Sequence, residues 1–264
     1  MVTDSIDFDR AAGYYDRTRG LPPDVIAAIV GVLAPELSGR EPCLEIGVGT
    51  GRIALPLHDA GVAMAGVDLA AAMLGELLGK SGGAPPFPLA LADATRLPLR
   101  DDSIGSGLCV HVLHLIPAWR HAVAELARVI RPGGVVLIDI GGTSSGDFGA
   151  IHARFCKEAE LIQDSHPGAN TIAEVDEAMA AHGAGARELP VVSGTGRDTT
   201  YEAVIRSFED GIFSWTWSLD DGARKSAGAA VRTWARERFG ALDRPLEHEL
   251  AISFRAYDLP LTRA

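Results

Sequence analysis

The stretch that decides the fold is CLEIGVGTGR, residues 43–52. Its short apolar run, three alternating glycines and following helical pattern predict a buried strand, a tight turn and a helix. Glycine lets a backbone approach a ligand closely and adopt conformations that a side chain forbids. The unpaired N–H groups at the start of the helix suit a carboxylate or hydroxyls. The pattern alone also fits a tight turn that binds no ligand.

Around this stretch, from about residue 41 to 140, short apolar runs alternate with segments of helical periodicity. This alternation is typical of a parallel sheet covered on both faces, and right-handed crossovers make it doubly wound, with a ligand crevice at the carboxyl ends of the strands. The expected strands are 43–46, 63–67, 87–90, 104–110, 135–140, 191–192 and 251–257. The expected helices are 8–19, 24–33, 52–60, 70–78, 118–129, 151–163, 171–181, 201–208 and 223–239.

The length of 264 residues suits one large α/β domain with insertions. We expect a single domain in which residues 1–34 form a helical arm and 41–195 with 245–264 form the core. Residues 196–244 are too long for a connecting loop and too few for a separate domain, so we expect a helical cap inserted between the last two strands.

Composition narrows the classes of partner. The formal net charge is -11 and no run is rich in Lys or Arg, so the average field would repel nucleic acid. The first ten residues carry acids where a secretory signal carries bases, and no apolar stretch approaches the ~20 residues of a membrane helix. We therefore expect a cytoplasmic protein that does not span a membrane.

Cys43, Cys109 and Cys156 lack a CxxC spacing and are expected to be reduced core thiols. No side-chain cluster has metal-ligand spacing.

Two acids follow the next expected strands. Asp68 ends the second strand, where a carboxylate can accept both hydroxyls of a ribose. It could equally cap the helix that begins at Ala70, and the two roles can coexist. Asp93 follows the third strand, where it could accept a hydrogen bond from an adenine amino group or stabilise a turn.

With further motifs, these residues resemble the class I S-adenosylmethionine-dependent methyltransferases, especially the small-molecule group similar to the ubiquinone and menaquinone biosynthesis methyltransferases. The matching segments keep the family's order and spacing over roughly residues 43–140, and YYDRTR at 14–19 also resembles the arm that these enzymes close over their cofactor. The segments are ExGxGxG at 45–51, VDL at 67–69 with ML at 73–74, ADA at 92–94 with LP at 97–98 and DDS at 101–103, VLH at 112–114 and ARVIRPGG at 127–134.

The resemblance implies a Rossmann-like, doubly wound sheet of seven strands, mostly parallel with an antiparallel last strand, plus the helical cap. It also implies that S-adenosyl-L-methionine is the cofactor. The backbone of Gly47, Gly49 and Gly51 would line the methionine part of that cofactor, Glu45 would support its amino group and Asp68 would hold the ribose.

The adenine end of the cofactor is implied in the same way. Leu69 and Met73 would flank the ring, Asp93 would accept from its amino group, and the Ala94 backbone would meet a ring nitrogen. These positions follow the second and third strands, so they belong to one edge of the expected sheet.

Methyl transfer is an in-line displacement at a sulfonium, in which the protein supplies orientation, desolvation and sometimes a base. By the resemblance, His111 faces the sulfonium and is the candidate catalytic base, since imidazole titrates near neutrality. His114 matches a histidine that many relatives carry and is interpreted as structural, and His152 as a surface histidine. Tyr15 and Arg19 would reach in from the arm, where a guanidinium can clamp the methionine carboxylate in two bonds.

The expected function is transfer of a methyl group to a small-molecule acceptor, apolar or aromatic in character. An aromatic cluster in the cap fits either an acceptor pocket or the core of the cap itself. The alternatives are an NAD-dependent oxidoreductase, which the shifted glycines and the RPGG turn disfavour, and a non-catalytic partner subunit with the same fold. The sequence leaves the oligomeric state open. The cluster comprises Phe208, Phe213, Trp215 and Trp217.

Overall fold

The computed structural model describes residues 5–139, 141, 146–162, 166–196, 199–246 and 249–262. The chain divides into two compact units. The first, a sheet with its helices, comprises Met1–Gly141, Pro167–Val192 and Ala251–Ala264, and the second, which is mainly helical, comprises Gly142–His166 and Ser193–Leu250.

The first unit contains a seven-stranded sheet in the order β3-β2-β1-β4-β5-β9-β6. The first five of these strands are parallel, and β9 runs antiparallel to both of its neighbours. The Rossmann-like α/β fold with one antiparallel strand is therefore confirmed. The strands are β1 Cys43–Ile46, β2 Met64–Asp68, β3 Leu89–Leu91, β4 Ile104–Val110, β5 Ile130–Asp139, β6 Gly185–Glu188 and β9 Arg255–Asp258.

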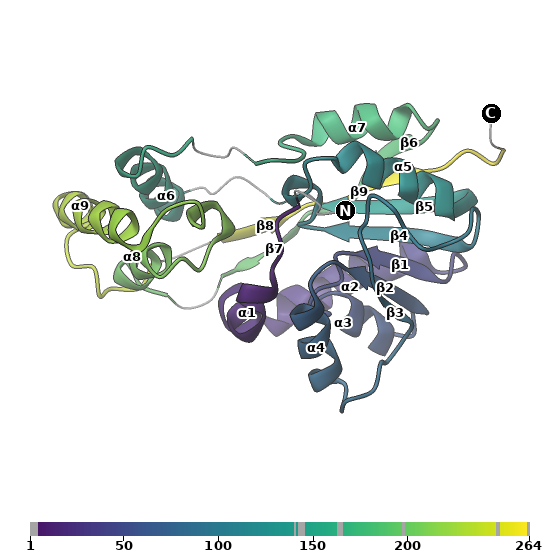
Figure 1. Cartoon of the computed structure of the whole chain (residues 1–264), viewed down its shortest axis with the longest axis horizontal. Coiled ribbons are helices and arrows are strands. Elements are labelled where there is room, and N and C mark those ends of the chain that lie inside the picture. Colours follow the sequence, from purple (N-terminus) through teal and green to yellow (C-terminus); the bar gives the residue numbers. More distant parts are fainter. Residues whose placement is uncertain are drawn as a thin grey trace. The chain divides into compact units, whose positions relative to one another are not determined.

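Figure 1 sets these strands between two groups of helices, α5 with α7 and α2 with α3 and α4. Every residue of β1 and β4 is buried, Glu45 and Ser106 included, so short and mostly apolar runs were a correct signal for the central strands. The α7 helix begins with a capping box, in which the Thr171 and Glu174 side chains each accept from the other's backbone N–H. The helices are α1 Ala12–Arg19 after the short η1 Asp9–Ala11, α2 Pro23–Leu37, α3 Ala54–Asp59, α4 Ala71–Lys80, α5 Trp119–Val129 and α7 Ile172–Ala180, with η2 Leu113–Leu115 after β4.

The last two strands differ from expectation. The sheet strand is β6, not 191–192, because all four β6 residues are exposed and give no apolar alternation to detect. Val192 instead begins β7 (Val192–Thr195), which pairs with β8 (Glu249–Ile252) in a separate two-stranded sheet. The expected strand 251–257 therefore divides between β8 and β9. The end of the expected fifth strand, Ile140, lies outside the described residues.

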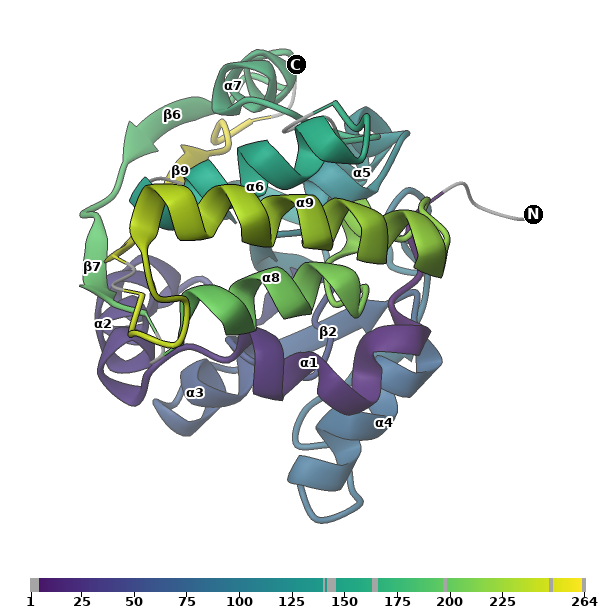
Figure 2. The same ribbon diagram turned by 90° about the vertical axis from the view of Figure 1, so that its left-hand side faces the viewer.

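The second unit contains α6 (Gly146–Glu158), α8 (Tyr201–Glu209), η3 (Ser214–Thr216) and α9 (Asp221–Phe239). Figure 2 shows α8 and α9 side by side, and α6 packs with both of them. The unit therefore contains α6 as well as the expected cap, because the three helices bury one apolar core. That core includes Ile151, Phe155, Val204, Ile205, Phe208 and Val231.

His152 is a correction. It exposes only 7% of its surface, and its ring centroid lies 4.6 Å from that of Trp215. The interpretation as a surface histidine is wrong, because the aromatic partners come from a segment about sixty residues later in the chain. Phe208, Phe213 and Trp215 pack in the same core, while the indole N–H of Trp217 donates to the Gly211 carbonyl at 2.8 Å. An acceptor pocket at this cluster stays a prediction.

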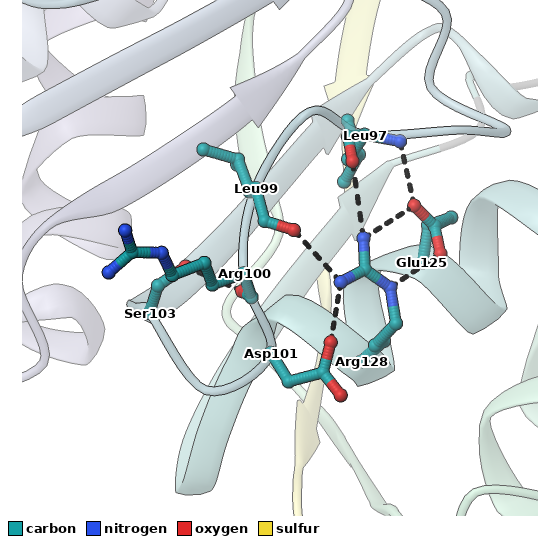
Figure 3. Close-up of polar contacts among 7 residues, drawn as sticks. All are labelled: Leu97, Leu99, Arg100, Asp101, Ser103, Glu125 and Arg128. Atoms are coloured by element: carbon teal, nitrogen blue, oxygen red, sulfur yellow. Dashed lines mark hydrogen bonds and ion pairs between the residues drawn. The ribbon is translucent and has the colours of Figure 1, made fainter.

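Arg128 joins α5 to the loop between β3 and β4. Figure 3 shows its guanidinium among four partners. It donates to the carbonyl oxygens of Leu97 at 3.2 Å and Leu99 at 2.9 Å, and to the carboxylates of Asp101 at 2.6 Å and Glu125 at 2.7 Å. The LP, DDS and ARVIRPGG motifs therefore meet in one structural contact.

We expect Arg128→Lys to lower the free energy of unfolding by about 2 kcal/mol, because an ammonium cannot serve two carbonyls and two carboxylates at once. Urea denaturation measures this change. Arg100→Lys is the matched control on the same loop, because the Arg100 side chain points away from this network (Figure 3). It should change stability by less than about 0.5 kcal/mol, and equal losses in both variants would contradict the assignment.

In the part of the chain that the structure describes, no single helix has the length and apolar composition needed to cross a membrane. Asp9–Arg19 and Pro23–Leu37, bent by 102°, reach them only as a pair. The cytoplasmic location stays a prediction. The three cysteines are free and buried, as expected.

Candidate cofactor and active site

The glycine loop follows β1 and has left-handed backbone conformations at Gly47, Gly49 and Gly51, with φ of 67°, 54° and 76°. A Cβ atom at Gly47 would lie 2.3 Å from Cγ2 of Val112, so the segment after β4 packs directly against the loop. A Cβ at Gly51 would lie 2.9 Å from Cγ of Leu55. The fold therefore favours glycine at positions 47 and 51 for two reasons, the left-handed backbone and the lack of space for a side chain.

Gly49 and Asp68 meet, as the sequence predicted for two parts of one site. The Gly49 N–H donates to Oδ2 of Asp68 at 2.7 Å, and the Ala70 N–H donates to Oδ1 at 2.8 Å. Burial raises the pKa of Asp68, while the hydrogen bonds from Ala70 and Gly49 act in the opposite direction. The capping role is wrong, because α4 begins at Ala71 with Ala70 as its N-cap and with no side-chain cap hydrogen bond, while Oδ1 of Asp68 accepts from the N–H of Ala70 itself. The ribose role stays a prediction. Met73 is buried beside this pair, with Cε 3.2 Å from the Cβ position of Gly49.

Glu45 is buried inside β1, with 3% of its surface exposed. Among the described residues, no hydrogen-bond partner reaches its Oε2 atom. Burial raises the pKa of Glu45 to about 8, although the charge of Arg52 acts to lower it. A buried carboxyl with an open oxygen is costly, and it suits a ligand that brings an ammonium group.

Asp93 forms the turn after β3. Its Oδ1 accepts from both the N–H and the hydroxyl of Thr95, each at 2.8 Å. The Ala92 N–H donates to the Asp68 carbonyl at 2.8 Å, so the ends of β2 and β3 lie next to each other. Leu69 is partly exposed and Ala94 buried at this edge. The turn role of Asp93 is confirmed, and the adenine contacts of all three residues stay predictions.

The arm contacts the glycine loop and α4 through residues that sequence analysis did not select. Asp16 accepts from the Thr50 hydroxyl at 2.6 Å and from Lys80 at 2.7 Å. Asp9 Oδ1 accepts from the Ala72 N–H at 2.7 Å, at the start of α4. Asp16 lies in the YYDRTR motif, but only its distant partners reveal its role.

Tyr15 and Arg19 lie on this arm. Tyr15 packs against the cluster of Ala12, Ala70 and Met73, and the Arg52 guanidinium lies 5.8 Å from the Tyr15 ring centroid. Burial and the charge of Arg52 lower the pKa of Arg19 to about 10, although Tyr15 acts to raise it. Arg19 is therefore still cationic at neutral pH, and its contact with a methionine carboxylate stays a prediction.

Asp16→Asn should loosen the arm, because Lys80 loses its charged partner and the Thr50 hydroxyl loses a strong acceptor. We expect trypsin to cleave after Arg17 and Arg19 several-fold faster than in the wild type, with S-adenosylhomocysteine slowing cleavage in both. Asp24→Asn, at an exposed position in the first turn of α2, is the control and should leave the rate unchanged. A cleavage rate that S-adenosylhomocysteine does not change would contradict arm closure.

His111 lies just past β4 in a left-handed conformation, with φ of 56°. Its Nε2 atom lies 2.7 Å from Oδ2 of Asp139, at the end of β5. Burial would raise the pKa of Asp139, but His111 and the Gly141 N–H together hold it below its usual range. Sequence analysis did not select Asp139, although it is the one acid in the apolar run 135–140. His114 lies in η2, where its carbonyl accepts from the Gly168 N–H at 3.0 Å.

No group of three or more His, Cys, Asp or Glu side chains among the described residues could hold a metal ion. The expected independence from metals is a prediction that turnover in a chelator would check.

Comparison with known proteins supplies the family. Residues 44–138 match the family described as "Methyltransferase domain". These residues form a methyltransferase domain. The resemblance to the class I methyltransferases is thereby confirmed for the part of the chain that carries the glycine loop, Asp68, Asp93 and His111.

Relatives of the methyltransferase domain extend the comparison. An uncharacterized methyltransferase of Mycobacterium tuberculosis is 32% identical over 131 residues, which is 49% of this chain and 50% of that protein. Phosphatidylethanolamine N-methyltransferase of Cereibacter sphaeroides is 34% identical over 119 residues, 42% of this chain and 58% of that protein. The chain thus spans about half the length of these relatives.

A solved structure gives the fold. Phosphoethanolamine N-methyltransferase 2 of Haemonchus contortus, in complex with phosphomonomethylethanolamine and S-adenosylhomocysteine, superimposes with a TM-score of 0.56 at 15% identity. The match covers 96% of this chain and 57% of that one. At 15% identity this similarity shows a shared fold.

Proposed function

We propose that this protein is an S-adenosylmethionine-dependent methyltransferase that acts on a small-molecule acceptor. The observation that carries the proposal is Glu45, a buried carboxyl with an open oxygen next to the glycine loop. The ammonium group of S-adenosylmethionine would give this oxygen a charged partner. A nicotinamide dinucleotide would instead bring its pyrophosphate to the glycine loop, where a buried carboxyl is unfavourable.

The residues present fit the donor at three points. The Gly49 backbone and Asp68 provide a polar edge for ribose hydroxyls, and Met73 provides apolar surface beside them. When bound, S-adenosylmethionine supplies an electrophilic methyl group on a sulfonium sulfur. The chain's own contribution is to orient the two reactants, with the arm excluding water and His111 as the candidate base.

The acceptor is proposed to be a small apolar or aromatic molecule. One relative is named as a methyltransferase of a lipid, phosphatidylethanolamine. This name supports a lipid-sized acceptor rather than nucleic acid. The net charge of -11 supports the same choice. Turnover of tritiated S-adenosylmethionine with an acceptor panel separates this enzyme from a non-catalytic partner subunit.

Titration calorimetry with S-adenosylhomocysteine and with NAD tests the cofactor. We expect Asp68→Ala to weaken binding of S-adenosylhomocysteine by about 1–3 kcal/mol, because ribose hydroxyls and the Gly49 N–H lose their charged acceptor. Asp68→Asn, which keeps one acceptor oxygen, should lose less. Asp59→Ala, at the exposed end of α3, is the control. Tight binding of NAD, or unchanged affinity in a folded Asp68→Ala protein, would refute this assignment.

A further inference from the structure

His111 and Asp139 form a side-chain pair at the carboxyl ends of β4 and β5. Asp139 exposes 5% of its side chain and His111 exposes 39%. The carboxylate is therefore buried, whereas the imidazole is accessible to a ligand. The His111 N–H also donates to the Asp139 carbonyl at 2.8 Å, and Oδ1 of Asp139 accepts from the Gly141 N–H at 2.7 Å. Backbone contacts thus fix both residues, and their side chains approach to 2.7 Å between Nε2 and Oδ2 without the alignment of a hydrogen bond.

The backbone of His111 has a left-handed conformation, which costs conformational free energy. A left-handed conformation is unfavourable for a residue with a side chain and persists only where the surroundings hold it. Here it brings the His111 ring to the buried carboxylate of Asp139. A Cβ atom at Gly141 would lie 3.7 Å from the His111 ring, so glycine there also leaves the imidazole room.

The pair also lies next to the cofactor loop. Val112, the residue after His111, fills the space that a side chain at Gly47 would need. The accessible imidazole is therefore on the same edge of the sheet as the glycine loop and Glu45, where the proposed methyl donor would bind.

We propose that Asp139 is a positioning residue that holds the His111 imidazole with its proton on Nε2, so that Nδ1 acts as base for an acceptor whose nucleophilic atom is a hydroxyl oxygen. The inference rests on the proposed function. A carboxylate has no proton to donate, so we expect the ring nitrogen that lies 2.7 Å from Oδ2 of Asp139 to carry the proton. The lone pair then lies on Nδ1.

The step balances without another reactant. The hydroxyl proton of the acceptor passes to Nδ1, and the electron pair that it leaves on oxygen forms the bond to the methyl carbon. The carbon–sulfur bond breaks with its electron pair remaining on sulfur. The products are the methyl ether and S-adenosylhomocysteine, and Asp139 stabilises the imidazolium until its proton is lost to water.

NMR of the full-length protein with ¹⁵N-labelled histidine reads the ring proton directly, with S-adenosylhomocysteine bound. We expect neutral His111 to carry its proton on Nε2 in the wild type. Asp139→Asn can donate its amide to Nε2 and should move the proton to Nδ1. His182→Gln, at an exposed position after α7, is the control and should leave the His111 signals unchanged, while His111→Gln identifies them. A wild-type proton on Nδ1 overturns the proposal without any variant.

Phenol and naphthol are the probes for the acceptor class. We expect methyl transfer to them to fall about 10²- to 10⁴-fold in His111→Gln and within the same range in Asp139→Asn, since the two act as a unit. The double variant should be no slower than His111→Gln. Full activity in Asp139→Asn overturns the positioning role. Transfer to dimethyl sulfide but to neither hydroxyl probe, or to no probe, overturns the acceptor class. Failure to bind S-adenosylhomocysteine would refute the proposed function instead.

Discussion

Glu45→Gln is expected to stabilise the ligand-free protein at high pH. In the unfolded chain this carboxyl ionises near its ordinary pKa of 4.5, whereas burial raises the pKa to about 8 in the fold. Between these values the folded state holds one proton more than the unfolded state, so stability falls as pH rises, by about 1.4 kcal/mol per pH unit. Glutamine stays neutral and avoids this loss.

Urea denaturation at pH 5 and pH 9 measures the effect. The stability gained by Glu45→Gln should be small at pH 5 and roughly 3–5 kcal/mol at pH 9. Glu76→Gln, exposed on α4, should show no such dependence. The same change should weaken binding of S-adenosylhomocysteine by about 1.5–3 kcal/mol, because the ammonium group loses a charged partner. A stability difference that is constant with pH would show that Glu45 ionises freely in the fold.

Gly47→Ala is expected to cost roughly 2–5 kcal/mol of unfolding free energy, combining a strained left-handed conformation with overpacking against Val112. Gly39→Ala separates these contributions. Gly39 has φ of 75° but nothing within 4 Å of its Cβ position, so it should lose only the backbone part, about 1–2 kcal/mol.

Adding Val112→Ala should return part of the loss in Gly47→Ala, because the shortest contact is to Cγ2 of that residue. Thermal or urea unfolding of the wild type, Gly47→Ala, Val112→Ala and the double variant completes this cycle. Equal losses at Gly47 and Gly39, with no recovery from Val112→Ala, would show that the glycine loop needs glycine only for its backbone conformation.

The central sheet was predictable because burial on both faces leaves short, mostly apolar runs in the sequence. The bounds of β1 and β4 match the expected ranges to the residue. The exposed strand β6 was missed because its sequence, GARE, carries no such signal. The expected RPGG turn was wrong, because residues 131–134 lie inside β5, which begins at Ile130, five residues earlier than expected, and shifts its register with β4 at this point.

The candidate site was predictable where its residues follow successive strands, since Gly49 and Asp68 do meet. The contact of Asp16 with Thr50 was not predictable, because these residues lie 34 positions apart on elements with no expected contact. His152 was misjudged for the same reason. Asp139 was missed although it lies at the end of β5, next to β4, because it was counted within an apolar run. A single sequence shows which side chains a strand delivers to its end, and only tertiary packing shows which of them touch.

The position of β9 has a consequence for biosynthesis. Residues 255–258 form the strand between β5 and β6, so a nascent chain leaving the ribosome has made every other strand of the sheet before this one. Until these residues emerge, β5 presents an unpaired edge and β6 has no neighbour, which is a state prone to association with other chains. Emergence of residues 255–258, rather than completion of the glycine loop, should therefore set the time at which this sheet closes, and chaperone binding to stalled chains should persist until residue 258 is exposed.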